Sequence, residues 1–167
     1  GVGDFGVPRW IPSGGEGLPT KPLAWVMAKW PNPGYANLYG PTETNVCAYY
    51  EVTALDPEAS APIPIGQACA NTELVAIAEN GERVTGPGRE GLLYARGSTE
   101  MQGYYGRSEA TQAGCIPNPF AVGREEQIYC TSDWVTLDDD GHYQFVGRQH
   151  PWGKTRGSPL SLGAIVA

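Results

Sequence analysis

Apolar and polar positions in the first third of the chain alternate in a way that predicts a strand, a helix and a second strand. A short apolar run at residues 9–11 leads into a glycine pair. Thr20 is a suitable helix cap, and Pro22 fits the first turn, where its missing N–H does no harm. Apolar residues then recur at helical spacing and predict a core-facing stripe of Leu23, Val26, Met27 and Trp30. The prolines that follow would end the helix, and residues 35–39 would return as a strand.

Beyond a Pro/Ala-rich stretch at residues 54–64, the pattern changes to short strands separated by turns. Asn80-Gly81 tolerates positive φ and predicts a hairpin. The acidic run at 138–141 predicts a second hairpin, because it lacks the further ligands of a calcium loop and fits a solvated turn. Ser108 would cap a short helix. The strands expected here cover residues 74–78, 91–95, 129–137 and 143–146.

The composition favours a turn-rich domain with an acidic surface. Of 167 residues, 41% are hydrophobic, which is enough for a core, and 23 glycines and 15 prolines favour short strands over a helical bundle. The formal net charge of −7 argues against nucleic-acid binding and docking to anionic membranes, since both need a basic face. The 4 cysteines show no zinc-binding spacing, which predicts reduced thiols in a cytoplasmic protein.

The densest chemistry lies in the run Tyr39-Gly40-Pro41-Thr42-Glu43. A Gly-Pro pair forces a tight turn, and small polar residues just after it can face a ligand. Thr42 could donate to a phosphate oxygen, Glu43 could hold Mg²⁺, and Tyr39 offers a flat face for a base. Taken alone, the same residues also fit a turn with only a structural purpose.

This run also matches the core motif of adenylate-forming enzymes, the family of amino-acid adenylation domains, acyl-CoA synthetases and luciferases. Other segments resemble further motifs of the family, in the family's order. They are Ser13-Gly14-Gly15-Glu16, Ile65-Gly66 to Asn71-Thr72, Glu90 to Gly97, Gly103-Tyr104-Tyr105, Tyr129 to Asp133, Gly147-Arg148 and Lys154 to Gly157. The chain is therefore identified as a member of this family, corresponding to a central part of the large N-terminal lobe.

The resemblance implies a fold of the α/β class. Residues 1–53 would form a partial parallel-sheet αβ unit, and residues 54–64 a connector. Residues 65–149 would form the small β-barrel-like subdomain of the large lobe. Residues 150–167 would hold the hinge, at His150, and the incomplete start of the small C-terminal lobe. On this interpretation the αβ unit lacks neighbouring strands, so we expect the isolated chain to be marginally stable or prone to aggregate.

The resemblance also implies an activity. Members of the family join ATP and a carboxylic acid into an acyl-adenylate with Mg²⁺, and then pass the acyl group to a thiol. The thiol belongs to coenzyme A or to the phosphopantetheinyl arm of a carrier protein. Asn45-Val46-Cys47 after the core motif favours the amino-acid-activating members, which serve nonribosomal peptide synthesis and antibiotic biosynthesis.

Roles can be carried over by position. Thr42 would face the phosphates and Glu43 would bind the Mg²⁺. ATP would also contact Gly14, Gly15, Glu16, Tyr39, Gly40, Asp133, Phe145 and Arg148. Among these, Tyr39 would stack on adenine and Asp133 would accept hydrogen bonds from both ribose hydroxyls. The substrate pocket would be lined by Ile11, Ser13, Leu38, Val46 and Cys47. This wall is apolar and small, which favours a small neutral amino acid such as proline.

Other positions depart from the family pattern. The phosphate loop would lie before Gly1 and the C-terminal catalytic lysine after Ala167, so we expect this stretch alone to be inactive. His150 stands where the hinge aspartate is usual, and the positions that follow lose their acidic residues. The alternative is therefore a catalytically degenerate relative that serves as a nucleotide-binding or carrier-docking scaffold.

Overall fold

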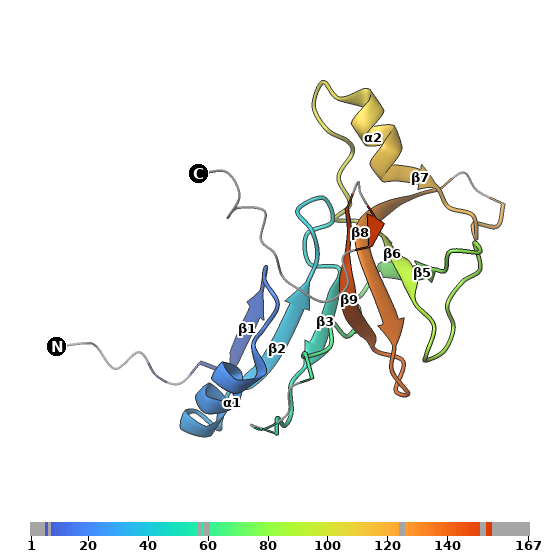
Figure 1. Cartoon of the computed structure of the whole chain (residues 1–167). Helices are drawn as coiled ribbons and strands as arrows, with labels where there is room; N and C mark the ends of the chain where they lie inside the picture. Colours follow the sequence, from blue (N-terminus) through green and yellow to red (C-terminus); the bar gives the residue numbers. More distant parts are fainter. Residues whose placement is uncertain are drawn as a thin grey trace, which may run out of the picture.

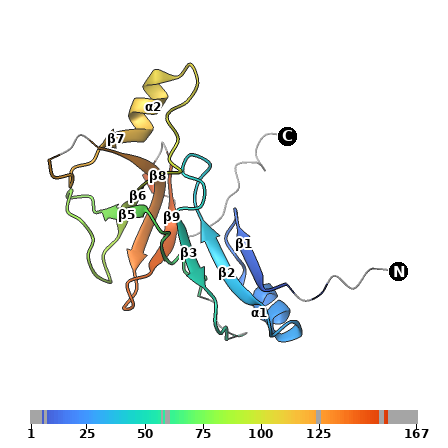
Figure 2. The same ribbon diagram turned by 180° about the vertical axis from the view of Figure 1, so that it is seen from behind.

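The chain forms two sheets that lie side by side, as Figure 1 and the reverse view in Figure 2 show. A computed structural model describes residues 6, 8–56, 58, 61–123, 126–150 and 153–154. The first sheet has the strand order β1-β2-β3-β4, and the second runs β10-β9-β8-β6-β5 with β7 paired to β8. Neither helix in this part of the chain is long and apolar enough to cross a membrane.

The first sheet is built on the αβ unit that the sequence predicts. β1 (Trp10–Gly14) and β2 (Gly34–Tyr39) are joined by α1 (Thr20–Lys29). The two strands pair in parallel, from Trp10 opposite Gly34 to Gly14 opposite Leu38. β3 (Ala48–Glu51) and β4 (Gln67–Ala68) extend the sheet antiparallel. The carboxyl ends of β1 and β2 therefore lie at the same edge, the edge at which α/β sheets bind ligands.

The ends of α1 differ from the sequence prediction. Pro19 occupies the cap position and Thr20 is the first helical residue. The Thr20 hydroxyl instead donates to the carbonyl of Ala61, 3.0 Å away. Leu23 is buried as expected, but Trp30 is 57% exposed, so the prediction that Trp30 belongs to the core-facing stripe was wrong. The helix ends at Lys29, and the non-helical backbone of Trp30 takes its side chain out of the helical stripe.

The second sheet is antiparallel throughout. It contains β5 (Thr72–Ile77), β6 (Gly91–Gly97), β7 (Cys115–Pro117), β8 (Gln127–Leu137), β9 (Tyr143–His150) and β10 (Gly153–Lys154). Its strands form a half-barrel in which β5 and β10 are the two ends of the pairing order. Both expected hairpin turns form, and Gly81 takes positive φ at the first of them. α2 (Ser108–Gly114) begins at Ser108, whose side chain makes no cap because Arg107 holds that position.

One hydrophobic core joins the two sheets. Cys47 and Ala48 from the first sheet pack with Leu74, Leu93 and Val135 from the second. A backbone bridge completes the junction, because the N–H of Tyr143 donates to the carbonyl of Gly66 at 2.8 Å and its carbonyl accepts from Gly66 at 3.2 Å. A smaller cluster fixes α1 on its sheet and consists of Leu23, Tyr35, Val52 and Ile63.

The stretch 54–64 contributes to this packing. Ile63 is buried, and the Pro64 carbonyl accepts a 2.8 Å hydrogen bond from the side chain of Asn37. Residues 57, 59 and 60 lie outside the described part, so the domain boundaries stay a prediction. For the expected hinge, the backbone of His150 ends β9 and pairs with Gly153, while its side chain lies outside the described residues.

Candidate active site

Two glycine-bearing loops meet at the carboxyl ends of β1 and β2. A Cβ atom on Gly14 would lie 2.7 Å from the carbonyl oxygen of Leu38, so glycine allows the two strand ends to approach closely. Gly14 ends β1, Gly15 and Glu16 follow it, and all three are exposed. The sequence-predicted nucleotide residues of β1 and those that follow Tyr39 are therefore brought to the same edge of the sheet.

The loop after β2 folds back tightly on itself. A Cβ on Gly40 would meet the carbonyl oxygen of Asn45 at 1.7 Å, which no side chain could tolerate. The Cys47 N–H donates to the Tyr39 carbonyl at 2.9 Å, and the Thr44 N–H donates to the Pro41 carbonyl at 3.1 Å. This turn leaves Thr42 exposed and Glu43 partly exposed. A hydroxyl and a carboxylate are thus presented at the sheet edge, as the sequence predicts.

Asp133 comes to the same place from the second sheet. It lies on β8 opposite Arg148 of β9, and it is only 5% exposed. The Tyr39 hydroxyl donates to Asp133 Oδ2 at 2.6 Å, across 94 positions of sequence. Arg148 Nε lies 3.5 Å from Asp133 Oδ1, with its side chain 58% exposed. The structure therefore joins the Tyr39 loop and the Asp133 strand by a short hydrogen bond.

The electrostatics of this pair follow from its burial. Burial raises the pKa of Asp133 above its ordinary value, and the Tyr39 hydrogen bond and the Arg148 charge offset only part of that rise. Burial and the neighbouring Asp133 charge also raise the pKa of the Tyr39 phenol. Tyr39 therefore keeps its proton and remains the donor. A carboxylate that is almost completely buried lowers the stability of the fold. This cost is the physical reason to regard Asp133 as a candidate binding residue.

Glu43 is held by a contact that the sequence analysis missed. The Tyr104 hydroxyl donates to Glu43 Oε1 at 2.6 Å and lies 3.4 Å from the Tyr129 hydroxyl. The segment Gly103-Tyr104-Tyr105 was noticed as a motif, but no pattern in it indicated a partner 61 positions away. The only available signal was that Tyr104 belongs to a matched segment.

The remaining expected contacts are spread more widely. Phe145 lies on β9 opposite Val135 and is 44% exposed, so it is not a buried core residue. Of the five pocket residues, Ile11 packs against the cluster beneath α1, Cys47 is buried and Val46 is exposed. The strand register places Ile11 and Ser13 on one face of the sheet and Leu38 on the other. The strand register alone therefore does not bring these residues together, and the substrate pocket stays a prediction.

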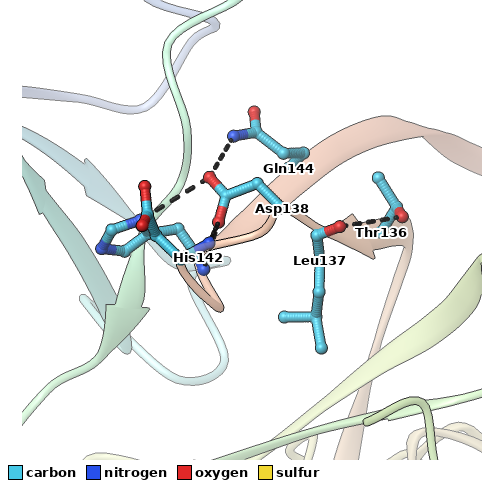
Figure 3. A network of polar contacts seen from close by, with 6 residues as sticks. Thr136, Leu137, Asp138, His142 and Gln144 are labelled. Atoms are coloured by element: carbon cyan, nitrogen blue, oxygen red, sulfur yellow. Dashed lines mark hydrogen bonds and ion pairs between the residues drawn. The ribbon is translucent and has the colours of Figure 1, made fainter. Parts of the chain in front are cut away.

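The acidic turn between β8 and β9 is organised by Asp138. Figure 3 shows its carboxylate accepting from the N–H of His142 at 2.8 Å and from Gln144 Nε2 at 2.9 Å. The N–H of Asp140 is a further donor, at 3.1 Å. The His142 ring meets Tyr50 of the first sheet edge-on, with centroids 5.1 Å apart. These contacts make the run a structural turn beside the junction of the two sheets.

Comparison with known proteins identifies the family of the chain. Residues 3–105, more than half of the chain, match the family model of the AMP-binding enzymes. The L-proline--[L-prolyl-carrier protein] ligase of Pseudomonas fluorescens is 37% identical over 153 residues, which are 92% of this chain and 28% of the ligase. Bacitracin synthase 1 of Bacillus licheniformis is 39% identical over 130 residues, 77% of this chain and 2% of the synthase.

Among solved structures, PA1221, an NRPS protein containing adenylation and PCP domains, superimposes with a TM-score of 0.77. It is 32% identical, and the match covers 84% of this chain and 28% of PA1221. The chain thus spans little more than a quarter of the length of the ligase and of PA1221. Fold, motif order and sequence similarity agree, and the chain belongs to the family of AMP-binding enzymes.

Proposed function

We propose that this chain is part of an ATP-dependent enzyme that activates a carboxylic acid as its adenylate and then transfers the acyl group to a thiol. The observation that carries the proposal is the contact between Tyr39 and the buried Asp133 carboxylate, 2.6 Å apart. It places a two-oxygen acceptor, held in a fixed orientation, next to the loops of two parallel strands. This combination suits a nucleotide, whose ribose offers two donors and whose phosphates need exposed loop donors.

The residues fit ATP and Mg²⁺ by their chemistry. Asp133 would accept the ribose hydroxyls, Tyr39 would lie against the base, and the exposed Thr42 would reach the phosphates. Glu43 would hold the Mg²⁺, since this ion is bound through one or two carboxylates together with phosphate oxygens. Bound Mg²⁺ would neutralise the charge that builds up on the phosphates. Gly14, Gly15 and Glu16 would border the nucleotide from the β1 side.

The reaction that this arrangement serves needs little covalent chemistry from the protein. A carboxylate oxygen of the acid forms a bond to the α-phosphorus of ATP, and the bond from that phosphorus to the bridging oxygen breaks, releasing pyrophosphate. A thiolate then forms a bond to the acyl carbon and AMP leaves. Positioning and charge neutralisation carry most of the catalysis in such steps.

For the acid, we propose a small neutral amino acid, with proline as the first candidate. The expected pocket residues are mostly apolar, and two of the relatives are named L-proline--[L-prolyl-carrier protein] ligases. For the thiol, we propose the phosphopantetheinyl arm of a carrier protein. The same names support this acceptor, as does the likeness to PA1221, which contains a PCP domain.

The test is ATP–pyrophosphate exchange by the complete protein that contains this chain, with a panel of small neutral amino acids that includes proline. We expect one acid to stimulate exchange well above the rate without acid. Exchange with a different acid would correct the substrate and keep the reaction. If ATP binds but no acid supports exchange, the degenerate scaffold would replace the enzyme.

A further inference from the structure

The segment that follows β6 in the second sheet contacts the loop between β2 and β3 of the first sheet, which carries Glu43 and is called the acidic loop below. The N–H of Met101 donates to the Glu43 carbonyl at 2.7 Å, and the Thr99 hydroxyl donates to the Thr44 carbonyl at 2.7 Å. The Tyr104 hydroxyl adds the contact to Glu43 Oε1 at 2.6 Å. Two of these bonds fix the backbone of the acidic loop, and the third fixes the carboxylate itself.

The tyrosine contact is part of a short chain of hydroxyls. Tyr104 has one hydroxyl proton, and it goes to Glu43, so the hydroxyl of Tyr129 is left as the donor in the 3.4 Å contact between the two tyrosines. Tyr129 is 6% exposed on β8, the strand that carries Asp133. The orientation of Glu43 is thereby tied to β8.

We propose that Tyr104 is a positioning residue for magnesium binding, which orients the Glu43 carboxylate through its hydroxyl with Tyr129 behind it. The inference rests on the proposed function, because it assigns Glu43 to the metal. Partners that orient a metal-ligating carboxylate fix its direction, and losing one typically lowers metal affinity about 10- to 100-fold. A carboxylate has about four acceptor positions, so Glu43 can accept from Tyr104 and bind a cation at once.

The test compares Tyr104→Phe with Tyr105→Phe in the complete protein. Each change removes one hydroxyl, and Tyr105 is fully exposed, so it serves as the matched control. Mn²⁺, which also prefers oxygen ligands, is titrated by electron paramagnetic resonance in the presence of a non-hydrolysable ATP analogue. We expect Tyr104→Phe to weaken Mn²⁺ binding about tenfold. Tyr105→Phe should leave Mn²⁺ affinity unchanged, and both variants should unfold at the temperature of the parent within a few degrees.

Kinetics and a double mutant separate this role from a structural one. Tyr104→Phe should raise the Mg²⁺ concentration needed for half-maximal exchange, with the KM for the acid unchanged. In a Glu43→Gln background, the same change should have almost no further effect on Mn²⁺ affinity, because Tyr104 acts through that carboxylate. Unchanged Mn²⁺ binding in Tyr104→Phe, with normal exchange by the parent, would overturn this inference alone. Absence of exchange in the parent would overturn the proposed function and this inference together.

Discussion

The two sheets contribute to the candidate site in opposite ways. The first sheet offers exposed residues on loops, among them Glu16 and Thr42 beyond the ends of parallel strands. The second sheet offers Asp133, which lies within a long strand and is almost completely buried. Loop residues can face a ligand at little expense to folding, whereas a buried carboxylate lowers stability unless it is hydrogen-bonded.

This difference shows how the site is assembled. Neither region can position its polar groups alone, because Tyr39 from the first holds Asp133 of the second, and Tyr104 from the second holds Glu43 of the first. The two hydrogen bonds cross between the regions in opposite directions. The site is therefore a property of the junction, and changes at the junction should have larger effects than changes at either periphery.

The largest effect is expected from Gly40→Ala in the first region. The added methyl group would overlap the Asn45 carbonyl, and the backbone of Cys47 lies close behind. The acidic loop would have to open, which we expect to destabilise the protein by about 3 kcal/mol and to abolish exchange. Gly86→Ala is the control, because a Cβ there meets nothing within 4 Å. Thermal unfolding measures the difference, and equal stability of the two variants would show that the loop is not tightly constrained.

Tyr39→Phe removes the hydrogen bond that joins the regions. The Asp133 carboxylate loses a charge-assisted donor, so we expect a loss of about 2 kcal/mol of stability at neutral pH. Tyr49→Phe is the control, since it removes a hydroxyl that accepts a 3.1 Å hydrogen bond from the exposed Gln67 side chain. In Tyr39→Phe the KM for ATP should rise, and the preference of the enzyme for ATP over 2′-deoxy-ATP should fall. An unchanged preference for ATP over 2′-deoxy-ATP would show that Tyr39 does not act through Asp133.

The hairpin turn at the edge of the second region should matter less. Asp138→Ala removes the acceptor for three donors around the turn. We expect it to lower the free energy of unfolding by about 1.5 kcal/mol. The control, Asp139→Ala at an exposed position, should leave the free energy of unfolding almost unchanged. Partial burial would raise the pKa of Asp138, but hydrogen bonds led by the His142 N–H hold it below its ordinary value. The contribution of the Asp138 carboxylate to stability is complete above the ordinary pKa of an aspartate, and it is lost as pH falls through the lower pKa of the folded protein. The free energies of unfolding of Asp138→Ala and Asp139→Ala should therefore become equal in acid, as denaturant unfolding at several pH values can establish.

Asp133→Asn should act on stability in the opposite direction. Burial raises the pKa of Asp133, so ionising it disfavours folding, and stability falls as pH rises from the ordinary pKa of an aspartate to that raised value. At neutral pH the asparagine removes a buried charge and still accepts the Tyr39 hydrogen bond. We expect Asp133→Asn to unfold at a slightly higher temperature than the parent at neutral pH. In acid this increase in unfolding temperature should be smaller. A lower unfolding temperature at every pH would mean that Arg148 and Tyr39 fully compensate the charge.

Local patterns predicted much of the first region. Apolar spacing and prolines located β1, α1 and β2, while the parallel pairing was implied by the family resemblance. Where local rules failed, tertiary contacts decided the outcome. Thr20 gives up its capping role to bond Ala61, and Trp30 leaves the stripe once the helix ends. In the second region, β7 was missed because a three-residue strand has too little periodicity to be recognised.

The motifs named candidate site residues but not their contacts. They pointed to Glu43 and Asp133 one at a time, and the structure places both beside the junction of the two sheets. The partners Tyr104 and Tyr39 are 61 and 94 positions away from them in sequence. Such pairs depend on how the two sheets pack, which no local pattern records. The pocket residues show the same limit, since their strand register separates Leu38 from Ser13.

The most direct test of the account is amino-acid-dependent ATP–pyrophosphate exchange by the complete protein, with one site residue changed in each region. Thr42→Val removes the exposed hydroxyl of the first region, and Asp133→Asn removes the buried charge of the second. If the two regions form one nucleotide site, each change should lower exchange about 100-fold while the protein stays folded. Exchange that survives either change at the parent rate would contradict a site shared by both regions.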